Sequence, residues 1–138
     1  MRVSKLVVLI VGAVLSAHAE VVIVVNKANP VGTLSRAQVK AMLLGSSKKW
    51  PGGAPVSVIT TSPGDPERKA ALSQFVGMTE QQFATALIQA NFKGEDRTPP
   101  KTLPSGKIIV QVVSLTPGAI GLIDSSDVVP GVKRVSVE

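Results

Sequence analysis

The sequence predicts an α/β protein, a three-layer sandwich with helices packed on a mostly parallel sheet of about four to five strands. Strand and helix patterns alternate along the chain, with Gly- and Pro-containing segments between them and no internal repeat. Apolar residues make up 44% of the 138 residues, which is enough for one small domain with a core. Aromatic residues make up only 3%, so this core must consist of Val, Leu, Ile and Ala.

The amino-terminal segment, residues 1–19, has the pattern of a secretory signal peptide. Arg2 and Lys5 precede an apolar run over residues 6–15, and Ala17-His18-Ala19 is a small-x-small cleavage site. We therefore expect cleavage after Ala19. The product is a single domain over residues 20–138, located in the periplasm or secreted.

A membrane-spanning helix is the alternative interpretation of this segment, because Val21–Val25 extends the apolar stretch to roughly the length that crosses a bilayer. Such a helix would contain His18 and Glu20, and a charge inside the bilayer costs about 2.5 to 3.5 kcal/mol on insertion scales. Cleavage avoids this cost, so we expect no stable membrane insertion of the mature chain.

The first strand and the first helix are well marked. Val21–Val25 is a continuous β-branched run, which is typical of a central strand covered on both faces. Ser35 and Gln38 form a capping box, and apolar residues recur after it at helical spacing. Gly45 then ends a helix of about ten residues.

The middle of the chain predicts a second strand and two adjacent helices. Residues 56–61 alternate well enough for a strand. Asp65 is an N-cap followed by Pro66, the favoured first helical residue, and Gly77 ends this helix. Thr79 begins the next helix with a second capping box.

The carboxyl-terminal third contains one ambiguous segment and two short strands. Residues 108–115 are rich in β-branched residues, which favours a strand, but their polar neighbours recur three and four apart. With Ser105 as its cap, we interpret this segment as a helix. Residues 118–123 and 132–137 are predicted strands, and the second alternates like a strand at the edge of a sheet.

Composition excludes several kinds of chemistry. The chain has no cysteine, so disulfides, thiolate nucleophiles and iron–sulfur clusters are excluded. His18 is the only histidine, and cleavage would remove it together with the commonest general base and metal ligand. No serine then has a histidine to activate it. We therefore expect a non-enzymatic protein without a cofactor.

The charge of the chain is modestly positive. The full chain carries a net charge of +6, and loss of Arg2 and Lys5 leaves 13 basic against 9 acidic residues, or +4. The remaining basic residues form isolated pairs without interleaved aromatic residues, so we do not expect a nucleic-acid partner.

Two minor features each have two interpretations. Asp124 and Asp127 could be half of a calcium site, but two carboxylates in a Ser-containing loop are more often a turn, so we expect no metal. Trp50 could be a platform for a ligand, although in a chain with so few aromatic residues a core anchor is the more frequent role.

Several short motifs are spread over most of the mature chain. They are Val25-Asn26-x-x-Asn29-Pro30-Val31-x-x-Leu34-Ser35, Leu44-Gly45, Trp50, Phe92-x-Gly94, Pro99-Pro100 and Pro117-Gly118-Ala119-Ile120-Gly121-Leu122. With these motifs the chain resembles the phosphate-binding proteins of bacterial ABC importers, and in particular short, single-lobe members of that group. The resemblance implies one lobe of a type II periplasmic binding protein-like fold.

The resemblance also implies a place for an anion. In the family, an arginine followed by a Ser-Gly-Thr turn at a helix N-terminus contributes to a phosphate site between two lobes. The corresponding segment here is 60–68, and it departs from the pattern because the upstream arginine is absent and two carboxylates are present. The candidate anion-binding residues are Thr60, Thr61, Ser62, Gly64 and Arg68.

We expect such a site to bind phosphate or another oxyanion weakly. Asp65 competes for the helix-start donors, and Asp65 and Glu67 repel an anion. Arg68 is the candidate cation, although a surface arginine paired with Asp65 or Glu67 is the more conservative interpretation. Because the chain has the length of one lobe, either another chain supplies the second lobe, or the alternative holds: a protein-interaction domain that has lost its ligand.

Overall fold

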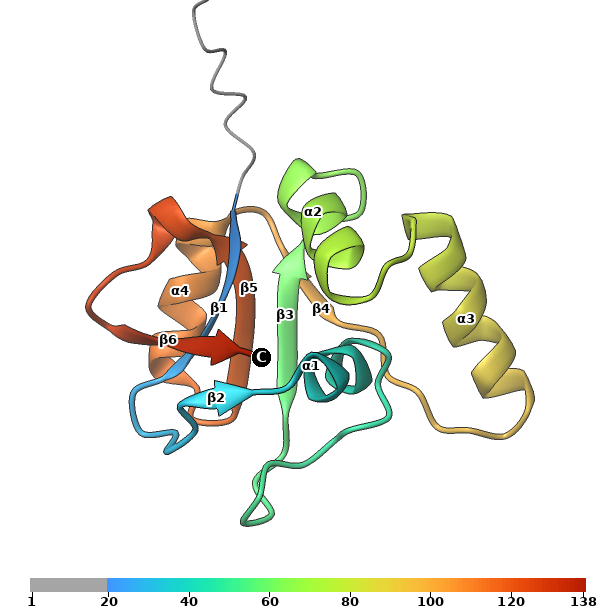
Figure 1. Ribbon diagram of the computed structural model, residues 1–138, viewed down its shortest axis with the longest axis horizontal. Coiled ribbons are helices and arrows are strands. Elements are labelled where there is room, and N and C mark those ends of the chain that lie inside the picture. The colour runs from blue at the N-terminus through green and yellow to red at the C-terminus, as the bar shows by residue number, and fades with distance from the viewer. Residues whose placement is uncertain (1–19) are drawn as a thin grey trace, which may run out of the picture.

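The computed structural model describes residues 20–138 and shows an α/β domain with helices on both sides of a central sheet (Figure 1). The predicted signal peptide and its cleavage site fall on residues 1–19, outside the described residues. No helix among residues 20–138 combines the length and the apolar character needed to cross a membrane.

The described elements follow one another in the predicted alternation. The strands are β1 (Val21–Asn26), β2 (Thr33–Leu34), β3 (Ser57–Thr61), β4 (Lys101–Leu103), β5 (Ala119–Asp124) and β6 (Val132–Val137). The helices are α1 (Arg36–Leu43), α2 (Pro66–Phe75), α3 (Glu80–Phe92) and α4 (Gly106–Leu115), with a short 3-10 turn, η1 (Ser125–Asp127).

The described strands form a six-stranded sheet in the order β2-β6-β1-β5-β3-β4. Three of the five neighbouring pairs are parallel, which confirms the predicted class, while β1 runs antiparallel to both of its neighbours. The sequence did not predict β2 and β4, because two or three residues are too few to show alternation. The prediction of β6 as an edge strand is wrong, since β2 pairs with Ser136 and Val137 on its outer side.

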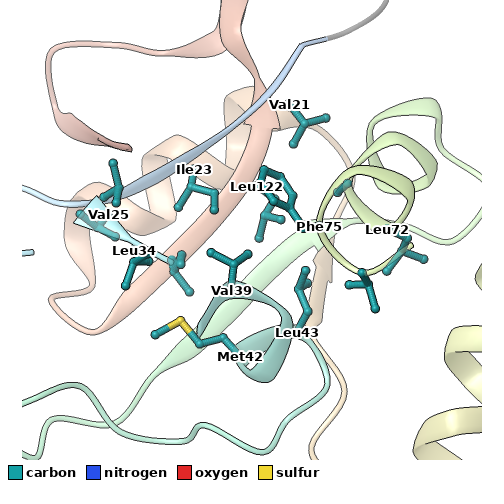
Figure 2. Packing of buried hydrophobic residues seen from close by; sticks show 14 of the residues in the cluster. Val21, Ile23, Val25, Leu34, Val39, Met42, Leu43, Leu72, Phe75 and Leu122 are labelled. Atoms are coloured by element: carbon teal, nitrogen blue, oxygen red, sulfur yellow. The ribbon is translucent and has the colours of Figure 1, made fainter. Parts of the chain in front are cut away.

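The central strand β1 is buried along its whole length, as predicted. Its side chains alternate between two apolar clusters, one on each face of the sheet. Val21, Ile23 and Val25 face a cluster formed with α1 and α2, which Figure 2 shows from close by. Val22 and Val24 face a second cluster beneath α4. The strand therefore joins the two cores of the three-layer sandwich.

The predicted helix starts are confirmed. The capping boxes at Ser35 and Thr79 are complete. Asp65 and Ser105 cap α2 and α4 through side-chain oxygens that accept backbone N–H groups. The ambiguous segment is helical because its apolar residues, such as Ile109, lie on one face that packs against the sheet.

Candidate functional site

The turn between β3 and α2 lies at the carboxyl end of the parallel strands, where several helix and strand ends meet. Thr61 ends β3, Gly64 makes the turn with a φ of 91°, and Asp65 begins α2. Because β3, β4 and β5 run parallel and α4 follows β4, the start of α4 and the end of β5 lie at the same end of the strands. Helix N-termini favour anions, so the fold would place an anion at this end.

The two threonine hydroxyls of the predicted site are already engaged within the chain. The Thr60 hydroxyl donates to the Thr61 carbonyl oxygen at 2.9 Å. The Thr61 hydroxyl donates to Asp65 Oδ1 at 3.1 Å, and the same oxygen accepts the Glu67 N–H at 2.9 Å. Both threonines are buried. Asp65 therefore occupies helix-start donors, as the sequence indicated.

Ser62 and Gly64 are the accessible members of the predicted site. Both residues are exposed. Within residues 20–138, neither the Ser62 hydroxyl nor the Gly64 N–H donates a hydrogen bond. An incoming anion would meet these two donors first.

Arg68 is placed differently from both sequence interpretations. It is not a surface residue paired with Asp65 or Glu67; it is buried, with 5% of its surface exposed. Its Nε and Nη2 donate to the two carboxylate oxygens of Glu80 at 2.9 Å each, and its Nη1 donates to Thr60 Oγ1 at 2.9 Å. The guanidinium also lies 5.5 Å from the centre of the Phe83 ring. The arginine therefore links α2 to α3, and its charge is balanced internally.

The Glu67 carboxylate lies where the start of α4 meets the end of β5. Glu67 Oε2 accepts the Asp124 N–H at 3.3 Å. A Cβ atom built on Gly106 would lie 3.1 Å from this oxygen and even closer to an oxygen of the Asp127 carboxylate. Both carboxylates therefore lie against Gly106. Burial raises the pKa of Glu67, and the hydrogen bond from the Asp124 N–H lowers it in part. The negative charges of Asp127, Asp65 and Asp124 raise this pKa further. Two carboxylates of the chain itself thus occupy the start of α4.

The pair Asp124 and Asp127 belongs to a turn. Asp124 Oδ1 accepts the Ser126 N–H at 2.8 Å and the Ser126 hydroxyl at 2.7 Å, which lowers the pKa of Asp124. Within residues 20–138, no group of three or more His, Cys, Asp or Glu residues has an arrangement that could hold a metal ion.

Trp50 is a core residue in this structure. It is buried in the cluster beneath α1 and α2, and its Nε1 donates to the Gly118 carbonyl oxygen at 3.0 Å. This bond ties the loop after α1 to the residue before β5. The core-anchor interpretation is confirmed.

The partners of Arg68 and Glu67 could not be predicted from the sequence. Glu80 lies twelve residues after Arg68, at the start of another helix, and Asp124 is far from Glu67 in the chain. Gly106 is the one available signal, because a glycine at the first position of a helix leaves room for neighbouring groups.

Comparison with known proteins supports the same family in two ways. The sequence matches the family profile of a PBP superfamily domain over residues 12–136. The fold is similar to that of an ABC-type phosphate transport receptor from Vibrio cholerae, with 23% identity and a TM-score of 0.67. That comparison covers 85% of this chain and 45% of the receptor. A search among curated proteins finds no significant match.

Two further solved structures are similar. One is assigned as a phosphate ABC transporter substrate-binding protein from Clostridium perfringens and holds bound phosphate; identity is 25%, the TM-score is 0.67, and coverage is 85% of this chain and 44% of that one. The other is PstS from Borrelia burgdorferi, with 15% identity, a TM-score of 0.67 and coverage of 86% and 47%. The chain spans a little under half the length of each of these proteins, and the resemblance inferred from the sequence motifs is confirmed.

Proposed function

Because this chain belongs to the PBP superfamily, we propose that its mature part is an exported, non-enzymatic binding lobe that takes phosphate or a similar oxyanion weakly at the β3–α2 turn. The observation that carries the proposal is the meeting of two exposed donors, at Ser62 and Gly64, with the N-terminus of α2. The solved relative that holds phosphate supports the ligand class.

Ser62 and Gly64 are the proposed primary contacts. Thr61 would join them only by giving up its bond to Asp65. Thr60 and Arg68 belong to the same site through their mutual bond at 2.9 Å, and they would support the turn from beneath. A direct contact from Arg68 would require it to leave Glu80.

Weak binding follows from charge and from solvent. Asp65 and Glu67 present negative charge within the same turn, and the Asp65 side chain already caps the helix. Exposed charge pairs are worth about 0 to 1 kcal/mol, so we expect millimolar affinity, about −4 kcal/mol. A second lobe supplied by another chain would exclude water and strengthen binding.

The test is calorimetric titration of the mature protein with phosphate and with sulfate. Asp65→Ser keeps a cap and removes one competing charge, so it should tighten binding, whereas Ser62→Ala should weaken it. Ser46→Ala, on an exposed loop after α1, is the matched control and should leave affinity unchanged. Submicromolar binding by the wild type would contradict the weakness, and identical affinities in all variants would place the site elsewhere.

Export is part of the proposal and has a separate test. Intact-mass analysis of protein from the periplasmic fraction should give a chain that starts at Glu20. Recovery of a chain with Met1 in the membrane fraction would contradict it. Association with an importer permease can be examined by co-purification from cells that express the neighbouring genes, in the presence and absence of phosphate.

A protein-interaction domain is the second candidate, and helix α3 favours it. The helix lies to one side of the sheet, beyond α2 (Figure 1), and residues 81–92 contain no charged residue. Ile88 and Phe92 are 69% and 92% exposed. Phenylalanine in an uncharged patch is typical of the centre of an interface with another protein. Pull-down with the wild type but not with the variant Ile88→Ser/Phe92→Ser would favour this function over anion capture.

A further inference from the structure

A cavity of about 680 Å³ lies at the opposite end of β3 from the proposed anion site. It is lined by Ser57 and Val58, which begin β3, whereas the β3–α2 turn follows the end of that strand. We call this cavity the basal groove. It is bounded by the loop after α1, the segment before β4 and the turn before β5, and its volume lies within the range of small-molecule sites.

The walls of the basal groove are mainly apolar and offer few backbone donors. Met42, Val56 and Val58 are among the lining residues, and Met42 lies at the margin of the labelled core residues in Figure 2. The three prolines of the lining, Pro55, Pro99 and Pro117, have no N–H group to offer a ligand. Four hydroxyl-bearing residues, Ser47, Ser57, Thr98 and Thr116, also line the groove. An aliphatic chain needs no hydrogen-bond partner and can lie along the apolar part of the wall.

The charges of the groove have one sign. Its only charged lining residues are Lys48 and Lys101, and no carboxylate is among the lining residues. Lys48 Nζ lies 2.8 Å from Asp96 Oδ2, so its charge is partly balanced. Lys101 is exposed on β4 and forms no ion pair with any residue from 20 to 138. Lys101 is therefore a positive charge without a carboxylate partner among residues 20–138, beside the mainly apolar basal groove.

We propose that the basal groove binds an amphiphilic monoanion, an aliphatic chain that ends in a carboxylate. The chain lies along the Met42, Val56 and Val58 side chains, and the carboxylate faces Lys101. Apolar burial supplies the affinity, and the lysine sets the orientation and the preference for an anion. This site is independent of the proposed phosphate site, which lies at the other end of the strand.

Trp50 provides a built-in reporter for the groove. It is the single tryptophan of the chain, and its indole N–H donates to the carbonyl of Gly118, which lines the groove. A ligand that enters the groove changes the surroundings of this bond, so the tryptophan emission should shift.

The test is titration of the mature protein with octanoate, followed by Trp50 fluorescence and by calorimetry. We expect saturable binding of octanoate and about fivefold weaker binding of octanol, which has the same chain length without the charge. Lys101→Glu should weaken octanoate binding about fivefold or more, with little effect on octanol. Lys107→Glu, an exposed lysine on α4, is the matched control and should leave both affinities unchanged. Ala54→Phe places a ring at the exposed rim of the groove and should reduce binding of both compounds, as measured by calorimetry.

The acid reaches the groove either free in solution or from a membrane that contains it, and vesicle flotation separates these two sources. Flotation with phosphatidylcholine vesicles that contain oleic acid, if it is lost in Lys101→Glu, supports the membrane source. Octanoate binding without such flotation supports the free acid. Absence of octanoate binding, or equal effects of Lys101→Glu and Lys107→Glu, would overturn the proposal. So would tighter binding of an acidic peptide than of octanoate. None of these results depends on phosphate binding, so the two sites stand or fall separately.

Discussion

The ion pair between Arg68 and Glu80 should contribute measurably to the stability of the domain, and its loss tests the description of the site. The guanidinium is buried, donates two hydrogen bonds of 2.9 Å to Glu80 and one of 2.9 Å to Thr60, and lies over the Phe83 ring. Glu80→Ala would remove one partner and leave the buried cation with only Thr60 and the ring.

The size of the effect follows from the exposure of the pair. Breaking a fully buried pair costs about 3 to 5 kcal/mol, and an exposed pair is worth about 0 to 1 kcal/mol. The Arg68 side chain is 6% exposed and that of Glu80 is 36% exposed, so this pair lies between the two cases. We expect Glu80→Ala to lower the free energy of unfolding by about 2 kcal/mol, which for a domain of this size is a fall in Tm of roughly 6–10 °C.

Urea denaturation followed by circular dichroism, in a double-mutant cycle with Arg68→Met, measures the coupling directly. We expect a coupling energy of about 1 to 2 kcal/mol between Arg68 and Glu80. Asp65→Asn, which keeps an N-cap, should show almost none with Arg68. A coupling below about 0.5 kcal/mol for Glu80, or a larger one for Asp65, would refute the reasoning, because the arginine would then be a surface residue of the first helical turn.

Three further predictions concern the carboxylate at α4, the central strand and the turn before β5. The pKa of Glu67 is raised above its ordinary value, so its contribution to stability is present at pH 4 and is lost as the pH rises through the folded-state pKa. Glu67→Gln, which keeps an acceptor for the Asp124 N–H, should therefore gain stability relative to the wild type between pH 4 and pH 7 in urea melts; a constant difference would contradict this. Val24→Asp should abolish soluble expression, because it buries an unpaired charge in β1; wild-type solubility and Tm would show that the strand is not covered on both faces. Gly118→Ala should cost about 1 to 3 kcal/mol by thermal melting, since its Cβ would clash with the Pro55 carbonyl oxygen, whereas Gly32→Ala meets no atom and is the control.

The local elements of this protein can be identified from residues that lie close together in the chain. Capping boxes and N-caps depend on residues three positions apart, so Ser35, Asp65, Thr79 and Ser105 could be identified without any tertiary contact. The burial of β1 could also be predicted from the sequence, because an unbroken β-branched run has no polar face to turn toward water. The position of the candidate anion turn followed from the same local signals, together with the family resemblance.

The way these elements pair with one another depends on contacts between segments that are far apart in the chain. A strand pattern does not specify the direction of its neighbours, so the antiparallel pairing of β1 and the covering of β6 by β2 were not predictable from it. Three features join segments that are separate in the chain. They are the ion pair of Arg68 with Glu80, the contact of Glu67 with the start of α4, and the basal groove. Caps are local hydrogen bonds, whereas the pairing of a buried charge and the shape of a groove depend on which surfaces the whole chain brings together.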